Sequence, residues 1–172
     1  MKLNTRRNKQ RGYLLDANVL MTAYRAYYAF DLCPGFWEAI KDGHARGRVF
    51  STLKVRNEIA HGKDRLADWI VSDLPDDFFM DDSTADISKR FAPMMAWVMT
   101  HGFKPAATAQ FADAADGWLA ATAQVHGHML VTLEARKDDA KKRVPLPNVC
   151  FEFGIPYCDT FEMLRDLGCS FR

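Results

Sequence analysis

The sequence lacks several patterns that would assign a function directly. It contains no G-x-G-x-x-G, no P-loop and no G-x-S-x-G, so dinucleotide-binding, nucleotide-triphosphate and serine-hydrolase functions have no support. Its four cysteines form no C-x-x-C pair and have no zinc-site spacing. No apolar run approaches the ~20 residues that span a bilayer, and no secretory apolar stretch follows the basic N-terminus. We therefore expect reduced, mostly packed thiols, no membrane contact and a cytoplasmic location.

Acidic residues are absent from the first twelve positions, although the whole chain has a net charge of only +1. These positions contain five basic residues, Lys2, Arg6, Arg7, Lys9 and Arg11. Removing them from the chain's 23 basic residues leaves 18 against 22 acidic ones, a net charge of −4. We expect residues 1–11 to form a basic flexible arm and residues 12–172 to form one domain. Two interpretations of this arm remain open: it binds a polyanion, or it is simply a solvated terminus.

The spacing of apolar residues predicts strands that alternate with helices along the chain. Strands are expected at 12–16, 48–51, 128–132 and 155–158, with a brief one inside 75–82. Helices are expected at 18–30, 35–47, 53–62, 64–73, 84–101, 113–127, 146–154 and 159–168. Residues 102–108 are expected to be a loop, and residues 134–143 a loop or an exposed helix. This order predicts a three-layer α/β/α domain with a central, mainly parallel sheet.

Four acidic residues map to the edge of this sheet at which the strands end. Asp16 ends the first strand, and Glu58 lies in the helix after the second. Asp116 opens the helix that leads into the third clear strand, and Glu134 follows that strand. Because ligands of open α/β sheets bind beyond the carboxyl ends of the strands, the pattern favours one shared site.

Each acid also has an ordinary alternative when it is taken alone. Asp16 is suited to cap the next helix, and Glu58 to be a solvated helix residue. Asp113 and Asp116 have the spacing of a helix cap followed by an acid in the first turn. Glu134 is suited to be an ordinary residue after a strand.

Four stretches in this order resemble the successive motifs of PIN domains, the nuclease domains of VapC-type toxins and of RNA-processing enzymes. They are "YLLDANVL" (13–20), "VRNEI" (55–59), "ADGWLAATA" (115–123) and "LVTLE" (130–134). The tail from 143 to 168 also resembles the end of a bacterial and archaeal PIN-like subfamily of poorly defined function. Three features depart from the family pattern: Leu119 where Ile is usual, Glu134 where Asp is more frequent, and a longer insertion at 62–108.

The resemblance implies a PIN-like domain with a metal-dependent nuclease site. It places Asp16, Glu58, Asp116 and Glu134 as catalytic residues and metal ligands, with the two aspartates central. Asp113 is an additional candidate ligand. Carboxylate oxygens, with no histidine or thiolate at the motif positions, favour Mg²⁺ or Mn²⁺. Candidate contacts to the substrate are Asn18, Thr132, Arg136 and Lys137.

The activity that the resemblance implies is a Mg²⁺- or Mn²⁺-dependent endoribonuclease that hydrolyses RNA phosphodiester bonds. Such a protein is expected to be the toxin of a type II toxin–antitoxin pair. Its partners would be the RNA substrate, a cognate antitoxin and a second copy of the chain in a homodimer. Two alternatives stay open: a catalytically silent PIN-like module that binds RNA or protein, and a carboxylate-metal nuclease that acts on DNA.

Overall fold

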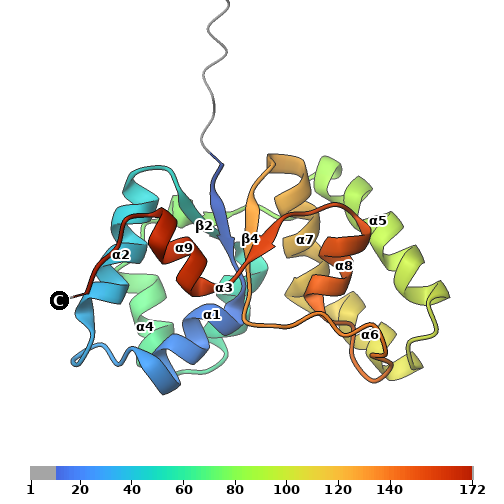
Figure 1. Cartoon of the computed structure of the whole chain (residues 1–172), viewed down its shortest axis with the longest axis horizontal. Coiled ribbons are helices and arrows are strands. Elements are labelled where there is room, and N and C mark those ends of the chain that lie inside the picture. The colour runs from blue at the N-terminus through green and yellow to red at the C-terminus, as the bar shows by residue number, and fades with distance from the viewer. Residues whose placement is uncertain (1–10, 172) are drawn as a thin grey trace, which may run out of the picture.

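Five short strands form one sheet at the centre of the part that the structure, a computed structural model, describes, residues 11–171 (Figure 1). They are β1 (Tyr13–Leu15), β2 (Val49–Thr52), β3 (Phe79–Met80), β4 (Met129–Val131) and β5 (Tyr157–Cys158). The strand order is β3-β2-β1-β4-β5, and every neighbouring pair is parallel. The predicted basic arm, apart from Arg11, lies outside the described residues.

Helices pack on both faces of the sheet, and the predicted three-layer α/β/α architecture is confirmed. In Figure 1 one side carries α1 (Ala17–Thr22), α2 (Pro34–Ala45), α4 (Arg65–Ser72) and α9 (Thr160–Asp166). The other side carries α5 (Ala85–Thr100), α6 (Pro105–Asp113), α7 (Ala115–His126) and α8 (Leu146–Glu152). A further helix, α3 (Leu53–Ala60), contacts α1, α4 and α7, and two short helical turns are η1 (Ala23–Tyr27) and η2 (Asp76–Phe78). Within residues 11–171, no helix combines the length and the apolarity that crossing a membrane requires.

The central strand explains why the first motif looks like core and yet ends in a carboxylate. β1 lies between β2 and β4, and Leu14 and Leu15 are completely buried. A parallel strand covered on both faces is expected to be apolar throughout. The chain therefore reaches the carboxyl edge of the sheet directly from the core, and the next residue, Asp16, stands at that edge.

Local capping fixes the helix that carries Glu58. The Oγ1 atom of Thr52, the last residue of β2, accepts a hydrogen bond from the backbone N–H of Val55. The neighbouring Ser51 hydroxyl donates instead to the carbonyl of Leu15, at 2.8 Å. Because α3 starts without a linker after β2, Glu58 is held at the same edge of the sheet as Asp16.

Two boundaries near α7 differ from the prediction. The prediction of a loop at 102–108 is wrong, because α6 begins at Pro105. Proline suits the first position of a helix, where a backbone N–H would have no partner within the helix. α6 then ends at Asp113, and α7 begins after Ala114, which makes no side-chain cap. The predicted capping role of Asp113 is therefore wrong, since this residue closes the preceding helix.

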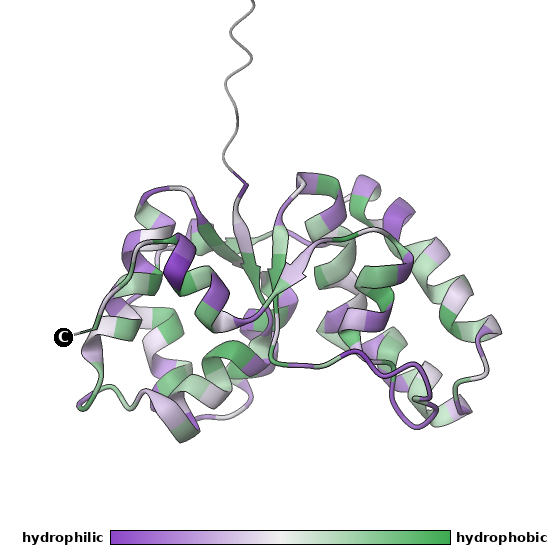
Figure 2. Cartoon of the chain, viewed as in Figure 1, coloured by the Kyte–Doolittle hydropathy of each residue, from purple (hydrophilic) through white to green (hydrophobic). Residues whose placement is uncertain are grey.

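Small buried residues let α7 pack closely on its neighbours. Leu119, Ala120, Ala121 and Ala123 are at most 1% exposed, because α7 contacts β4, α5, α6 and α8. Figure 2 shows the resulting hydrophobic α7 beside hydrophobic strands. The alanine-rich motif is thus a packing requirement of the helix that positions Asp116.

We predict that Gly117→Ala lowers the free energy of unfolding by about 1–2 kcal/mol. A Cβ atom there would lie 2.6 Å from Cε2 of Phe91 and 2.8 Å from Cζ of Phe111. Overpacking of this kind costs about 1–3 kcal/mol, which exceeds the gain of about 1 kcal/mol in helix propensity. Chemical denaturation monitored by circular dichroism measures the change.

The matched control is Gly35→Ala in α2. The atoms nearest to its Cβ would belong to the ring of Phe171, a side chain near the C-terminus that is 41% exposed. We expect this variant to be within about 0.5 kcal/mol of the wild type, as is usual for surface changes. Equal stability of the two variants would contradict the assigned packing of α7.

Candidate functional site

Asp16 is the most buried of the four predicted catalytic acids. Its side chain is 4% exposed, and although Asp16 is the N-cap residue of α1, its carboxylate makes no capping hydrogen bond. Oδ2 instead accepts a hydrogen bond of 2.8 Å from the Thr132 hydroxyl, which lies just after β4. The ordinary role of a side-chain helix cap is therefore excluded for this residue, and its carboxylate is directed across the carboxyl edge of the sheet.

Asn18 and Thr132 join this carboxylate to the segment that carries Glu134. The Asn18 amide donates to Thr132 Oγ1 at 3.3 Å, and the Asn18 carbonyl oxygen accepts from the backbone N–H of Leu133 at 3.2 Å. The backbone N–H of Glu134 also donates to Thr132 Oγ1, at 3.2 Å. These two predicted site residues therefore tie together two stretches that are more than a hundred positions apart.

The electrostatics place all four predicted acids in one neighbourhood. Burial, together with the negative charges of Asp116, Glu134 and Glu58, raises the pKa of Asp16 to about 7 against the opposing effect of the hydrogen bond from Thr132. Burial, with the charges of Glu134 and Glu58, raises the pKa of Asp116 to about 6. The pKa of Glu58 is raised as well, chiefly by partial burial. The carboxylates thus repel one another across the edge of the sheet.

Glu134 differs from the other acids because both of its oxygens already have partners. Oε2 accepts a hydrogen bond of 2.9 Å from the backbone N–H of Leu146, the first residue of α8. Oε1 forms an ion pair with the guanidinium of Arg143. The positive charge of Arg143 also lowers the pKa of Asp116 and of Glu58. Arg143 is therefore a cation that acts on three of the four acids.

A cavity of about 380 Å³ opens beside Glu58 and Asp116. Its polar lining also includes Asp113, Lys54, Asn57, His61, Gln110 and Arg143. The sequence analysis did not single out Lys54, Asn57, His61 or Gln110. Lys54, Asn57, Glu58 and His61 have the i, i+3, i+4, i+7 spacing of one helix face, and this was the signal that could have found three of them.

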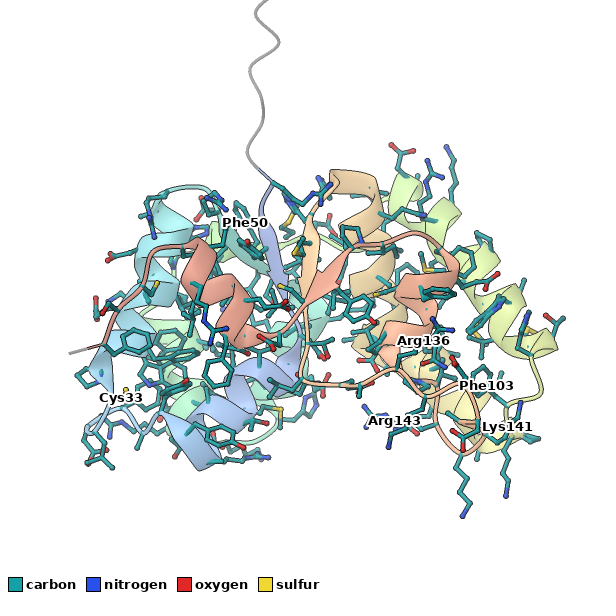
Figure 3. The ribbon with its side chains drawn as sticks, viewed as in Figure 1. Cys33, Phe50, Phe103, Arg136, Lys141 and Arg143 are labelled. Carbon is teal, nitrogen blue, oxygen red and sulfur yellow. The ribbon has the colours of Figure 1, made fainter. Side chains whose placement is uncertain are left out.

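The predicted contacts Arg136 and Lys137 lie on a different part of the surface. They belong to the connecting segment, residues 133–145, which links β4 to α8 without helix or strand and is strongly hydrophilic (Figure 2). Arg136 lies 3.5 Å from the ring centre of Phe151 and pairs with Asp138. Figure 3 shows Arg136 on the side of Phe103 and Lys141, whereas Arg143 is apart from these three residues.

The chemistry of the donor set fits a hard divalent cation. The four acids supply only oxygen atoms, and burial raises the pKa of the nearby Cys150 thiol to about 12, so that it stays protonated. Within the described part of the chain, however, no three His, Cys, Asp or Glu side chains are arranged to hold one ion. In addition, Glu134 is engaged by Arg143. The ligand assignment of Asp16, Glu58, Asp116, Glu134 and Asp113 therefore stays a prediction.

Comparison with known proteins identifies a family and a fold. Residues 13–171 match the family described as "Domain of unknown function (DUF4411)". Comparison with the curated proteins gives no match. Among solved structures, one similar chain belongs to "VapBC2 from Rickettsia felis bound to a DNA fragment from their promoter". The two chains are 14% identical with a TM-score of 0.52, over 86% of this chain and 97% of that chain.

At 14% identity, the likeness to the VapBC2 chain shows the fold alone. That fold agrees with the parallel sheet, the flanking helices and the order of the motifs described above. The chain therefore belongs to the DUF4411 family, and its fold is PIN-like.

Proposed function

We propose that the protein is a Mg²⁺- or Mn²⁺-dependent endoribonuclease and the toxin of a type II toxin–antitoxin pair. One observation carries the proposal: Asp16 is buried at the carboxyl edge of the sheet, caps nothing with its side chain, and has its pKa raised by burial and by the negative charges of three further acids. A buried carboxylate with like-charged neighbours destabilises a fold unless a ligand compensates it. Such an arrangement is a candidate functional site on physical grounds.

The residues divide into roles according to their positions. Asp16 and Asp116 would hold the cation, because burial raises the pKa of both and they come from different elements, the end of β1 and the first turn of α7. Glu58 and Glu134 would complete the ligand set or orient the attacking water. Thr132 and Asn18 keep Asp16 in place through the hydrogen bonds described above. A bound Mg²⁺ or Mn²⁺ supplies Lewis-acid polarisation of a phosphodiester and a lowered pKa of bound water.

The toxin assignment is supported by the fold and by the motif order. VapBC2 is a complex bound to a fragment of its promoter, and one of its chains shares this fold. By analogy, this chain would act as the toxin and bind a small DNA-binding antitoxin as its partner. A gene for such a protein next to this one, and a complex on co-expression, are the observations that test this part.

A second candidate, a PIN-like module that binds RNA without cleaving it, is favoured by one observation. Glu134 is engaged by Arg143 and by the backbone of Leu146, so one of the four acids is not available to an ion as it stands. A protein that binds RNA as tightly in EDTA as in Mg²⁺, and never cuts it, would identify this function. Assays on single-stranded and branched DNA in parallel separate the third candidate, a DNA nuclease.

We predict that Asp16→Asn and Asp116→Asn each reduce cleavage of structured RNA in Mn²⁺ on the order of 100-fold or more. Each substitution removes a negative charge that would hold the cation, and the loss of one preorganised electrostatic contact has effects of this size. The measurement is the single-turnover cleavage rate. The control is Asp86→Asn on the exposed face of α5, which should keep the wild-type rate; equal rates in all four proteins would end the proposal.

Mn²⁺ should also stabilise the wild type against thermal unfolding. A ligand that binds only the folded state at 100 times its Kd adds about 2.7 kcal/mol. We expect a clear rise in Tm for the wild type and for Asp86→Asn, and almost none for Asp16→Asn. Differential scanning calorimetry with and without Mn²⁺ measures the change in Tm. An equal rise in the Tm of Asp16→Asn would show that Asp16 is not a ligand of the ion.

Without metal, the protein should lose stability as the pH rises from about 4 to about 7. The pKa of Asp16 is raised to about 7 by burial and like charges, so in this range the folded state binds more protons than the unfolded state. At pH 8 we expect Asp16→Asn to be more stable than the wild type by about 1–3 kcal/mol, and at pH 4 the difference should vanish. Urea unfolding in EDTA at both pH values tests the sign.

A further inference from the structure

Arg143 is the cation that pairs with one of the four acids of the site. It pairs with Oε1 of Glu134, while Oε2 of the same carboxylate accepts from the Leu146 N–H. Its charge is also felt by Asp116 and Glu58, which line the same cavity as Arg143. A guanidinium therefore lies among the acids that an ion would need.

The two partners of this ion pair differ in how firmly they are held. The Glu134 side chain is 13% exposed, whereas that of Arg143 is 60% exposed. Ion pairs with an exposed partner are weak and easily exchanged. The backbone of the connecting segment is anchored, because Lys137 and Asn148 exchange two hydrogen bonds and the Lys141 carbonyl accepts from the Lys104 N–H. Breaking the ion pair between Glu134 and Arg143 thus requires only the Arg143 side chain to move.

The cavity offers Arg143 a second partner. Besides Arg143, its lining contains Lys54 and His61, and these groups face the side of the acidic cluster formed by Glu58 and Asp116. The carboxylates alone would repel the negative charge of a phosphodiester. The cationic and amide groups beside them offset this repulsion, so the cavity is suited to bind one. A guanidinium is the side chain best matched to a phosphate, because two parallel N–H groups can bind two of its oxygens.

We propose that Arg143 substitutes for the divalent cation on Glu134 in the metal-free protein, and turns to a phosphate of the RNA when the ion takes its place. This exchange rests on the proposed function, since it requires a cation at the acidic site. The exchange gives Arg143 two opposite effects: it weakens binding of the ion and strengthens binding of the RNA. A residue that only supports the connecting segment would not produce opposite effects.

The test is calorimetric titration of Mn²⁺ alone into metal-free wild type and Arg143→Gln, followed by measurement of the KM for RNA. We expect Arg143→Gln to bind Mn²⁺ roughly three- to tenfold more tightly, because a competing positive charge is gone. The KM for RNA should rise by a similar factor, because a phosphate contact is lost. Arg143→Lys, which keeps the charge but not the fork of N–H donors, should bind Mn²⁺ with an affinity closer to that of the wild type.

Arg136→Gln is the matched control, because it removes the same charge from the same segment. Arg136 pairs with Asp138 and contacts Phe151, and is not among the residues that line the cavity. We expect its Mn²⁺ affinity to be unchanged. Mn²⁺ affinity in Arg143→Gln equal to or weaker than that of the wild type overturns the exchange while leaving the proposed function intact. Absence of Mn²⁺ binding in every protein overturns both.

Discussion

The burial of negative charge at the carboxyl edge of a parallel sheet is the constraint on which the rest of this structure depends. β1 is the central strand, so Asp16 emerges where solvent hardly reaches, and its 4% exposure leaves hydration unable to stabilise the anion. Three other acids are brought to the same edge by α3, α7 and the segment after β4. Each of these placements increases the electrostatic cost of the others. A fold that keeps all four has retained an instability that is relieved either by protonation or by a positively charged partner.

The strand–helix alternation made the fold predictable. Strands as short as β1 and β4 were identified because they are continuously apolar, and the crossover helices between them require a parallel sheet. The N-cap at Thr52 and the end of α7 at Gly127, which has φ of 69°, followed from local chemistry. Helix α6 was missed, because residues 102–108 were expected to be a loop although Pro105 suits the first position of a helix and the alanine-rich residues after it have high helix propensity. Only the backbone shows that Ala114 interrupts the helix.

The site was predictable as a set of positions but not as a set of contacts. The order of Asp16, Glu58, Asp116 and Glu134 follows from sheet topology, since every carboxyl end of a parallel strand faces one edge. Which basic residue reaches that edge does not follow from sequence distance. Arg136 is two positions from Glu134 yet lies against Phe151, whereas Arg143 is nine positions away and pairs with it. The path of the connecting segment decides this, and that path is set by its anchors on Asn148 and Lys104.

The glutamate at position 134 has a consequence that an aspartate would not have. Its carboxylate reaches both the Leu146 N–H and the Arg143 guanidinium, so its charge is compensated by the protein itself. Asp16 has a single neutral donor, the Thr132 hydroxyl, and the pKa values of Asp16 and Asp116 remain raised. The negative charge of the site is therefore unevenly balanced, with Glu134 satisfied and the two buried aspartates not. The uncompensated negative charge lies on the two aspartates, and this is where a divalent cation would give the largest gain in stability.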